Sequence, residues 1–102
     1  MIARMWRGRA ETAKADAYLR HFTESVVPEL KHMAGHCGAW LLRREADSRT
    51  EFVALTLWES RRAIETFTGP DISVSIVGPE GRAALSDFDD FATHYEVAFK
   101  TA

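Results

Sequence analysis

Two side chains in this sequence could move a proton or hold an anion. His94 belongs to the residue type that titrates near neutral pH, so it could take a proton from a phenol or orient a ligand. Arg4 offers a charged, forked set of donors that suits a phenolate or a carboxylate. Each also has a structural explanation, since His94 could bond to Glu96 and Arg4 could pair with Glu96 or Glu45. Both alternatives stay open, and His94 and Arg4 are the candidate catalytic residues.

Large aromatic residues recur in the segments around these two groups. Such rings line apolar pockets and stack on flat ligands. Packing in a core or between two copies would explain them equally well. Tyr18 could reach the mouth of a pocket, although a place in the core or an interface is the simpler interpretation. The candidate substrate-binding residues are Trp6, Phe52, Thr56, Trp58 and Phe67.

Metal and nucleophile signals are weak. His32, His36 and Cys37 supply only three groups around an expected helix end and turn, so a local turn is the better explanation and no metal site is predicted. No base is placed beside Cys37 by the sequence. Residues 78–81, with the sequence Gly-Pro-Glu-Gly, lack the spacing of a phosphate-binding loop.

The elements that position these groups follow from periodicity and turn residues. Pro28 is expected to kink or split the first helix near residues 24–25, and Ser60 has the chemistry of an N-cap. Residues 71–77 fit either a helix or an extended chain. The predicted series is strand 2–9, helix 11–33, strand 38–46, strand 51–58, a short helix after Ser60 that Gly69 ends, a short helix 79–85, and strand 91–99.

This order of strands and helices predicts an α+β, ferredoxin-like βαββαβ fold, an antiparallel sheet with both helices on one face. Alternation along the strands separates two faces of that sheet. The first face is almost wholly apolar, and we expect it to carry the helices. Its members are Ala3, Met5, Trp40, Leu42, Val53, Leu55, Leu57, Tyr95, Val97 and Phe99.

The second face mixes large aromatic rings with small and charged residues. Its members are Ile2, Arg4, Trp6, Leu41, Arg43, Phe52, Ala54, Thr56, Trp58, Ala92, His94 and Glu96. Its rings are unsuited to water and its charges are unsuited to a monomer core. We therefore expect it to meet the same face of a second copy in a symmetric dimer, with a cavity between the two sheets.

Composition limits the classes of protein that need to be considered. A chain of 102 residues, 46% hydrophobic and 27% charged, fits a single globular domain spanning residues 1–102. The net charge of −2 argues against a nucleic-acid or anionic-membrane partner. No apolar run approaches the roughly 18 residues of a membrane span, and the first residues lack the apolar core of a secretory signal. A cytoplasmic location is the expectation. The chain contains neither Asn nor Gln, so no side-chain amide can take part in its chemistry.

Several short motifs resemble the antibiotic biosynthesis monooxygenase family. They are Trp58-Glu59-Ser60, the following Phe67 and Gly69, the run His94-Tyr95-Glu96-Val97, and the Arg4-x-Trp6 of the first strand. The resemblance implies a dimeric α/β barrel of two ferredoxin-like protomers. One branch of the family oxidises polyphenolic polyketide intermediates with molecular oxygen and no cofactor, and another cleaves haem. This sequence has Ala54 and Ile64 where the first branch has Asn and Tyr.

Taken with the resemblance, the residues suggest a cofactor-independent monooxygenase for a flat aromatic small molecule, polyketide-like or a quinol. His94 would act as base, Arg4 would stabilise the anion, and Trp58 and Trp6 would sandwich the ring. The alternative is a non-catalytic homodimer that binds haem or another hydrophobic ligand, with His94 as the axial ligand. A third possibility is a dimer whose interface is filled and holds no pocket.

Overall fold

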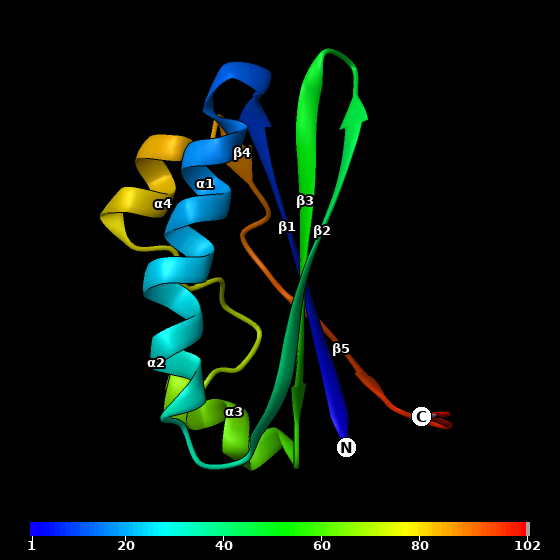
Figure 1. Ribbon diagram of the computed structural model, residues 1–102. Helices are drawn as coiled ribbons and strands as arrows, with labels where there is room; N and C mark the ends of the chain where they lie inside the picture. The colour runs from blue at the N-terminus through cyan, green and yellow to red at the C-terminus, as the bar shows by residue number, and fades with distance from the viewer. Residues whose placement is uncertain (102) are drawn as a thin grey trace.

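The computed structural model describes residues 1–101 and contains one antiparallel sheet with helices along one side of it (Figure 1). The strands lie in the order β2-β3-β1, and both β4 and β5 pair with the other edge of β1. This is the predicted ferredoxin-like arrangement, and that prediction is confirmed. The elements are β1 (Ile2–Glu11), a 3-10 turn (Thr12–Lys14), α1 (Ala15–His21), a π turn (Phe22–Val26), α2 (Val27–Lys31), β2 (His36–Ala46), β3 (Arg49–Trp58), α3 (Arg61–Thr68), α4 (Pro79–Ala84), β4 (Asp87–Phe88) and β5 (Thr93–Glu96).

The first helix is interrupted where the sequence indicates a break. Pro28 has no backbone N–H, and its ring crowds the carbonyl four residues earlier. The helix accommodates it with the π turn Phe22–Val26, which separates α1 from α2. The predicted strand 91–99 is shorter, since only Thr93–Glu96 pairs with β1. No helix in residues 1–101 has the length and apolar character needed to cross a membrane.

Residues 70–78, here called the strap, contain the segment 71–77 that the sequence predicted as either a helix or an extended chain. The strap is an extended connection from α3 to α4, without a regular element of its own. Val74 forms a single antiparallel bridge with Phe91. Two backbone hydrogen bonds add to this bridge, from Ser75 N to Asp90 O at 3.0 Å and from Ala92 N to Ser73 O at 2.8 Å.

Three residues set the two ends of α3 and its contact with the turn before β2. Ser60 Oγ accepts a hydrogen bond from Ala63 N at 3.1 Å, so the predicted N-cap is confirmed. Gly35 has φ +84°, and a Cβ atom added to it would lie 2.5 Å from the Cβ atom of Ala63. Gly69 has the same φ of +84°, but a Cβ atom there would meet nothing within 4 Å.

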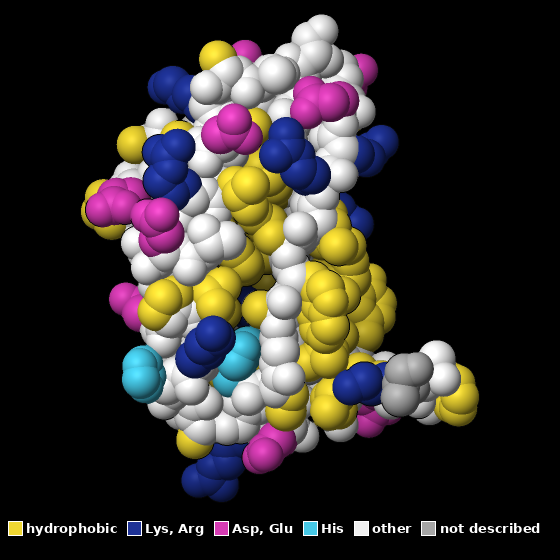
Figure 2. Space-filling model, viewed as in Figure 1, with side chains coloured by type: hydrophobic (Ala, Val, Ile, Leu, Met, Phe, Trp, Pro, Cys, Tyr) yellow, Lys and Arg dark blue, Asp and Glu magenta, His cyan; other side chains and the backbone are white. Residues whose placement is uncertain are grey.

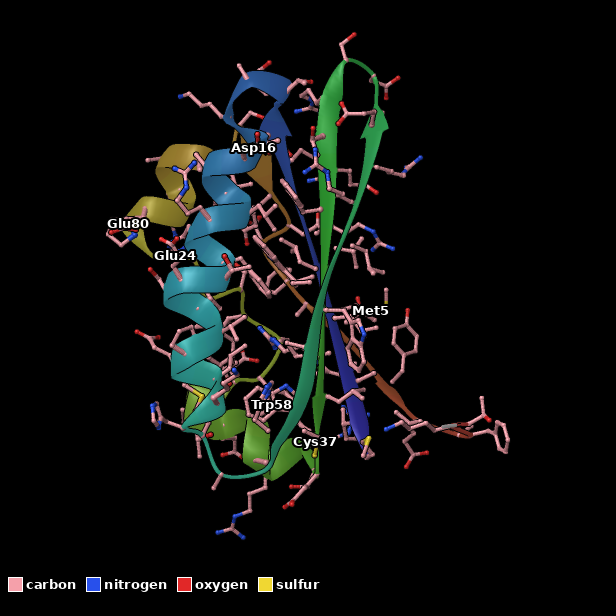
Figure 3. The ribbon with its side chains drawn as sticks, in the orientation of Figure 1. Met5, Asp16, Glu24, Cys37, Trp58 and Glu80 are labelled. Atoms are coloured by element: carbon pink, nitrogen blue, oxygen red, sulfur yellow. The ribbon has the colours of Figure 1, made fainter. Side chains whose placement is uncertain are left out.

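The prediction of which sheet face the helices cover is wrong. Phe52 and Trp58, on the mixed face, are fully buried beneath the helices, while Trp40 and Leu42, on the apolar face, are 47% and 48% exposed. Figure 3 shows the difference, because Trp58 points toward the helices and Met5 points away from them. Large aromatic rings fill the space under the helices, and the buried charge of Arg4 is bonded to backbone carbonyls of the strap. A count of apolar residues on each face could not show this.

Candidate functional site

A pocket lies within the single chain, between the covered face of the sheet and the helices. Its volume is about 70 Å³, enough for a few water molecules and too small for a compound of several rings until a wall moves. The pocket wall is mostly apolar, and the strap forms part of it. The lining residues are Arg4, Trp6, Tyr18, His21, Phe22, Val26, Leu30, Ala54, Thr56, Phe67, Ile76, Val77, Gly78 and Gly81. The expected position of the cavity, between two copies, is therefore corrected.

Arg4 is a buried cation in the pocket wall. Its residue surface is 4% exposed, and its guanidinium lies 5.6 Å from the centre of the Phe67 ring. Arg4 Nη1 donates to Ile72 O, and Arg4 Nη2 donates to Val74 O at 2.7 Å. Among residues 1–101 no carboxylate pairs with Arg4. Burial lowers the pKa of Arg4 to about 10, so the group stays charged at neutral pH.

His94 lies beside Arg4, as the sequence predicted. Arg4 and His94 are opposite each other in the β1–β5 register, and Arg4 Nη1 is 3.0 Å from His94 Nε2. Because a guanidinium can only donate, His94 Nε2 accepts and the ring carries its proton on Nδ1. Burial, followed by the charges of Arg4 and Arg61, holds the pKa of His94 below its ordinary value. The imidazole is not among the residues that line the pocket.

The aromatic candidates divide into pocket and core. Trp6, Thr56 and Phe67 line the pocket, and Trp6 Nε1 donates to the carbonyl of Asp89 at 2.8 Å. Trp58 is fully buried behind them, where its Nε1 donates to Thr56 Oγ1 at 2.9 Å and its ring stacks on Phe67 at 6.1 Å. Trp58 therefore positions two lining residues from the core.

Phe52, the remaining aromatic candidate, is also fully buried outside the lining. Its ring packs 5.0 Å from the ring of Tyr18, which does line the pocket. The sequence left two places open for Tyr18, the mouth of a pocket and, as the simpler interpretation, a core or an interface; the structure places Tyr18 in the pocket lining. The spacing of Tyr18, Phe22, Val26 and Leu30 by four residues could have indicated this stripe.

The remaining chemical candidates lie apart from the pocket. Cys37 is exposed at the start of β2, where Sγ is 3.4 Å from the carbonyl oxygen of Gly35. The ring of His36 packs edge-on against Trp58, with centroids 5.1 Å apart. Within residues 1–101, no three His, Cys, Asp or Glu side chains gather as a metal site would require.

Fold and pocket together define a ferredoxin-like protein with a mostly apolar pocket that contains one buried cation. The sequence matches the family described as antibiotic biosynthesis monooxygenase over residues 1–72. The chain belongs to this family. A search of curated proteins gives no significant match.

Three solved structures share the fold. A protein from Bacillus cereus assigned to the antibiotic biosynthesis monooxygenases has a TM-score of 0.68 at 16% identity, covering 100% of this chain and 95% of its own. A haem degrader from Mycobacterium tuberculosis, with two haems in its active site, has a TM-score of 0.63 at 16% identity over 100% of both chains. A Streptomyces coelicolor monooxygenase in complex with nanaomycin D has a TM-score of 0.58 at 15% identity, covering 99% and 88%.

Proposed function

We propose that this protein is a cofactor-independent monooxygenase for a flat aromatic phenol or quinol, and that the reaction takes place in the pocket of each chain. Family membership and the ligand-bound relatives support the class. The observation that carries the proposal is the buried charge of Arg4, which no carboxylate in residues 1–101 neutralises, in an otherwise apolar wall. A buried cation without a counter-charge favours an anionic partner.

The proposed chemistry needs a deprotonated substrate and molecular oxygen. Ionisation of the phenol gives an anion that Arg4 stabilises and that transfers one electron to O2. Recombination of the two radicals forms a C–O bond at a ring CH2 or CH carbon. Loss of water from the resulting peroxide gives the carbonyl of a quinone. One O2 is consumed, one oxygen atom enters the product and the other leaves as water.

His94 is the proposed base. At present its imidazole does not line the pocket and its Nε2 accepts from Arg4 at 3.0 Å, so a substrate oxygen reaches the lone pair only by taking over that Arg4 donor. The nearby charge of Arg4 also lowers the pKa of a bound phenol, which reduces the strength that the base needs. Arg4 and His94 would then act on the same substrate oxygen.

Oxygen uptake with 1,8-dihydroxyanthrone tests the proposal, after subtraction of autoxidation in buffer. We expect the wild type to consume one O2 per substrate, and Arg4→Met to lose about 10²-fold in rate because one stabiliser of the developing anion is gone. His94→Ala should also be slower. Arg7→Met, an exposed change on the same strand, is the matched control. Uptake equal to buffer, or equal rates in wild type and Arg4→Met, would contradict the proposal.

Haem binding is the alternative that the Mycobacterium tuberculosis relative suggests. The residues present favour it less, since a haem would need both the Nε2 atom of His94, which is now bonded to Arg4, and a larger movement of the strap than a ligand of two or three rings. We derive no step through haem. Titration with hemin checks this point, because a Soret shift that is lost in His94→Ala would favour haem binding.

We also propose that a second copy of the chain covers the open face of the sheet. This face carries large exposed hydrophobic residues: Trp40 is 47% exposed, Leu42 48% and Tyr95 54%. Figure 2 shows hydrophobic side chains gathered over the sheet. Monomers seldom expose apolar patches of this kind. Leu42→Glu should shift the sedimentation coefficient from dimer to monomer, and Ala17→Glu on the exposed side of α1 should not. A monomeric wild type at micromolar concentration would refute the dimer.

A further inference from the structure

The Tyr18 hydroxyl is a polar group in the pocket whose role the proposed reaction does not explain. Tyr18 lines the pocket and is 4% exposed. Among residues 1–101 its hydroxyl makes no hydrogen bond, and it is not enclosed, because His36 Nδ1 is the one fully buried side-chain atom without a partner in the part of the chain that the structure describes. The hydroxyl is therefore a donor that a molecule in the pocket, water or ligand, can engage.

The ring of Tyr18 is fixed by its neighbours. It packs against Phe52 at 5.0 Å and against the His21 ring at 6.1 Å, both between centroids. Burial raises the pKa of Tyr18 to about 12, so at neutral pH the group is a phenol that can donate a hydrogen bond. A fixed, neutral donor needs no charge on its acceptor, so it can hold the oxygen of a ketone or quinone carbonyl while the anionic oxygen of the same ligand goes to Arg4.

The other polar groups in the wall have partners of their own. Thr56 Oγ1 accepts from Trp58 Nε1 at 2.9 Å, and His21 Nδ1 is 3.3 Å from Glu80 Oε2. Arg4 is the one lining side chain with a formal permanent charge. The pocket therefore offers a cation from β1 and a neutral donor from α1, with apolar surface making up most of the remaining wall.

We infer that Tyr18 is a specificity-determining residue, and that the pocket takes flat ligands carrying both an anionic oxygen for Arg4 and an uncharged carbonyl oxygen for Tyr18. Hydroxyquinones and hydroxyaryl ketones belong to this class. The inference rests on the pocket of the proposed function and does not depend on the oxygenation step. The strap has to move outward to admit two fused rings, because the present volume is about 70 Å³.

Calorimetric titration with two probes under anaerobic conditions tests the inference. 2-Hydroxy-1,4-naphthoquinone has an ionised hydroxyl at neutral pH and a quinone carbonyl, whereas 2-naphthoate has the anion and no separate carbonyl. Tyr18→Phe removes only the hydroxyl and keeps the ring packed on Phe52. Tyr95→Phe makes the same change on the opposite face of the sheet, at a residue that does not line the pocket.

We expect Tyr18→Phe to weaken binding of the hydroxyquinone about fivefold, the value of one neutral hydrogen bond. Binding of 2-naphthoate should change by less than about twofold, since that probe does not use the Tyr18 donor. Arg4→Met should weaken both probes at least about tenfold. Tyr95→Phe should alter neither.

An equal effect of Tyr18→Phe on the two probes, or no effect on the hydroxyquinone, would overturn the inference. So would a wild type that binds neither probe at 1 mM. Failure of the proposed function looks different: the Tyr18-dependent difference between the probes would persist, and oxygen uptake with the anthrone would be absent.

Discussion

Replacing Arg4 by Met should release the strap while leaving the rest of the fold in place. Arg4 is bonded to the carbonyls of Ile72 and Val74, which lie two residues apart in the strap. Met matches the length of the buried stem and carries no donor. The two carbonyls then lose their shared partner, and the strap keeps its backbone bonds to residues 90–92 and its bonds from Arg82 to Val77 O and Gly78 O.

The size of the effect follows from two opposing quantities. Two hydrogen bonds from a charged donor contribute about 3–6 kcal/mol together. Against this, burial of the charged Arg4 side chain has a free-energy cost, which is recovered when the strap opens. The lowering of the Arg4 pKa from 12.5 to about 10 puts this cost at about 2–3 kcal/mol, after allowance for water that reaches the pocket. The net loss for Arg4→Met is about 1.4–2.7 kcal/mol of local stability, which is roughly 10- to 100-fold in the open population.

Amide hydrogen exchange measures this directly. The Ser75 and Ala92 amides bond across the strap at 3.0 and 2.8 Å, so their exchange should accelerate roughly 10- to 100-fold in Arg4→Met. The urea midpoint should move little, and Arg7→Met should change neither quantity. Unchanged exchange at both amides would refute the reasoning. A fall in global stability as large as the local effect would instead make Arg4 an ordinary core residue.

Two further predictions concern folding stability. Gly35→Ala should lower the free energy of unfolding in urea by about 2–4 kcal/mol, because the strain of a positive φ adds to the clash with Ala63 of α3. Gly69→Ala, at the same φ but with no atom nearby, should lower it by only about 1 kcal/mol. Equal losses would show that the contact with α3 is unimportant. The pKa of His94 lies below its ordinary value, so the unfolded chain binds the proton more tightly and stability should fall as pH decreases below about 6.5. His94→Gln, whose side-chain oxygen can still accept from Arg4, should remove part of this loss of stability at low pH. The remaining part is due to His36, whose pKa is also lowered by burial. An unchanged dependence of stability on pH would exclude His94 as a cause.

Much of the local structure could be predicted because it depends on neighbouring residues. Pro28 fixed the position of the helix break, and the Ser60 hydroxyl fixed the start of α3. The meeting of Arg4 and His94 followed from strand order alone, since β1 and β5 are adjacent in a ferredoxin-like sheet. Each of these predictions needed only backbone chemistry or topology.

The position of the pocket could not be predicted because it depends on three-dimensional packing. The charge of Arg4 indicated that helices do not cover this face, because the sequence did not reveal any partner for it. Its partners are backbone carbonyls of the strap, a segment whose position no periodic pattern predicts. The four-residue spacing from Tyr18 to Leu30 drifts around a regular helix, so the spacing alone did not single out Tyr18. The π turn widens one turn of the helix, so Tyr18 and Leu30 share a face that a regular helix would rotate apart.

The enclosed position of the pocket has a consequence for stoichiometry. The pocket of a single chain already contains the cation, the aromatic rings and part of the strap, so we expect each chain to bind its ligand independently. If active chains were mixed with chains carrying Arg4→Met, the rate would fall in proportion to the fraction of active chains, not to the square of that fraction. Saturation by ligand would follow a simple hyperbola, with one molecule bound per chain.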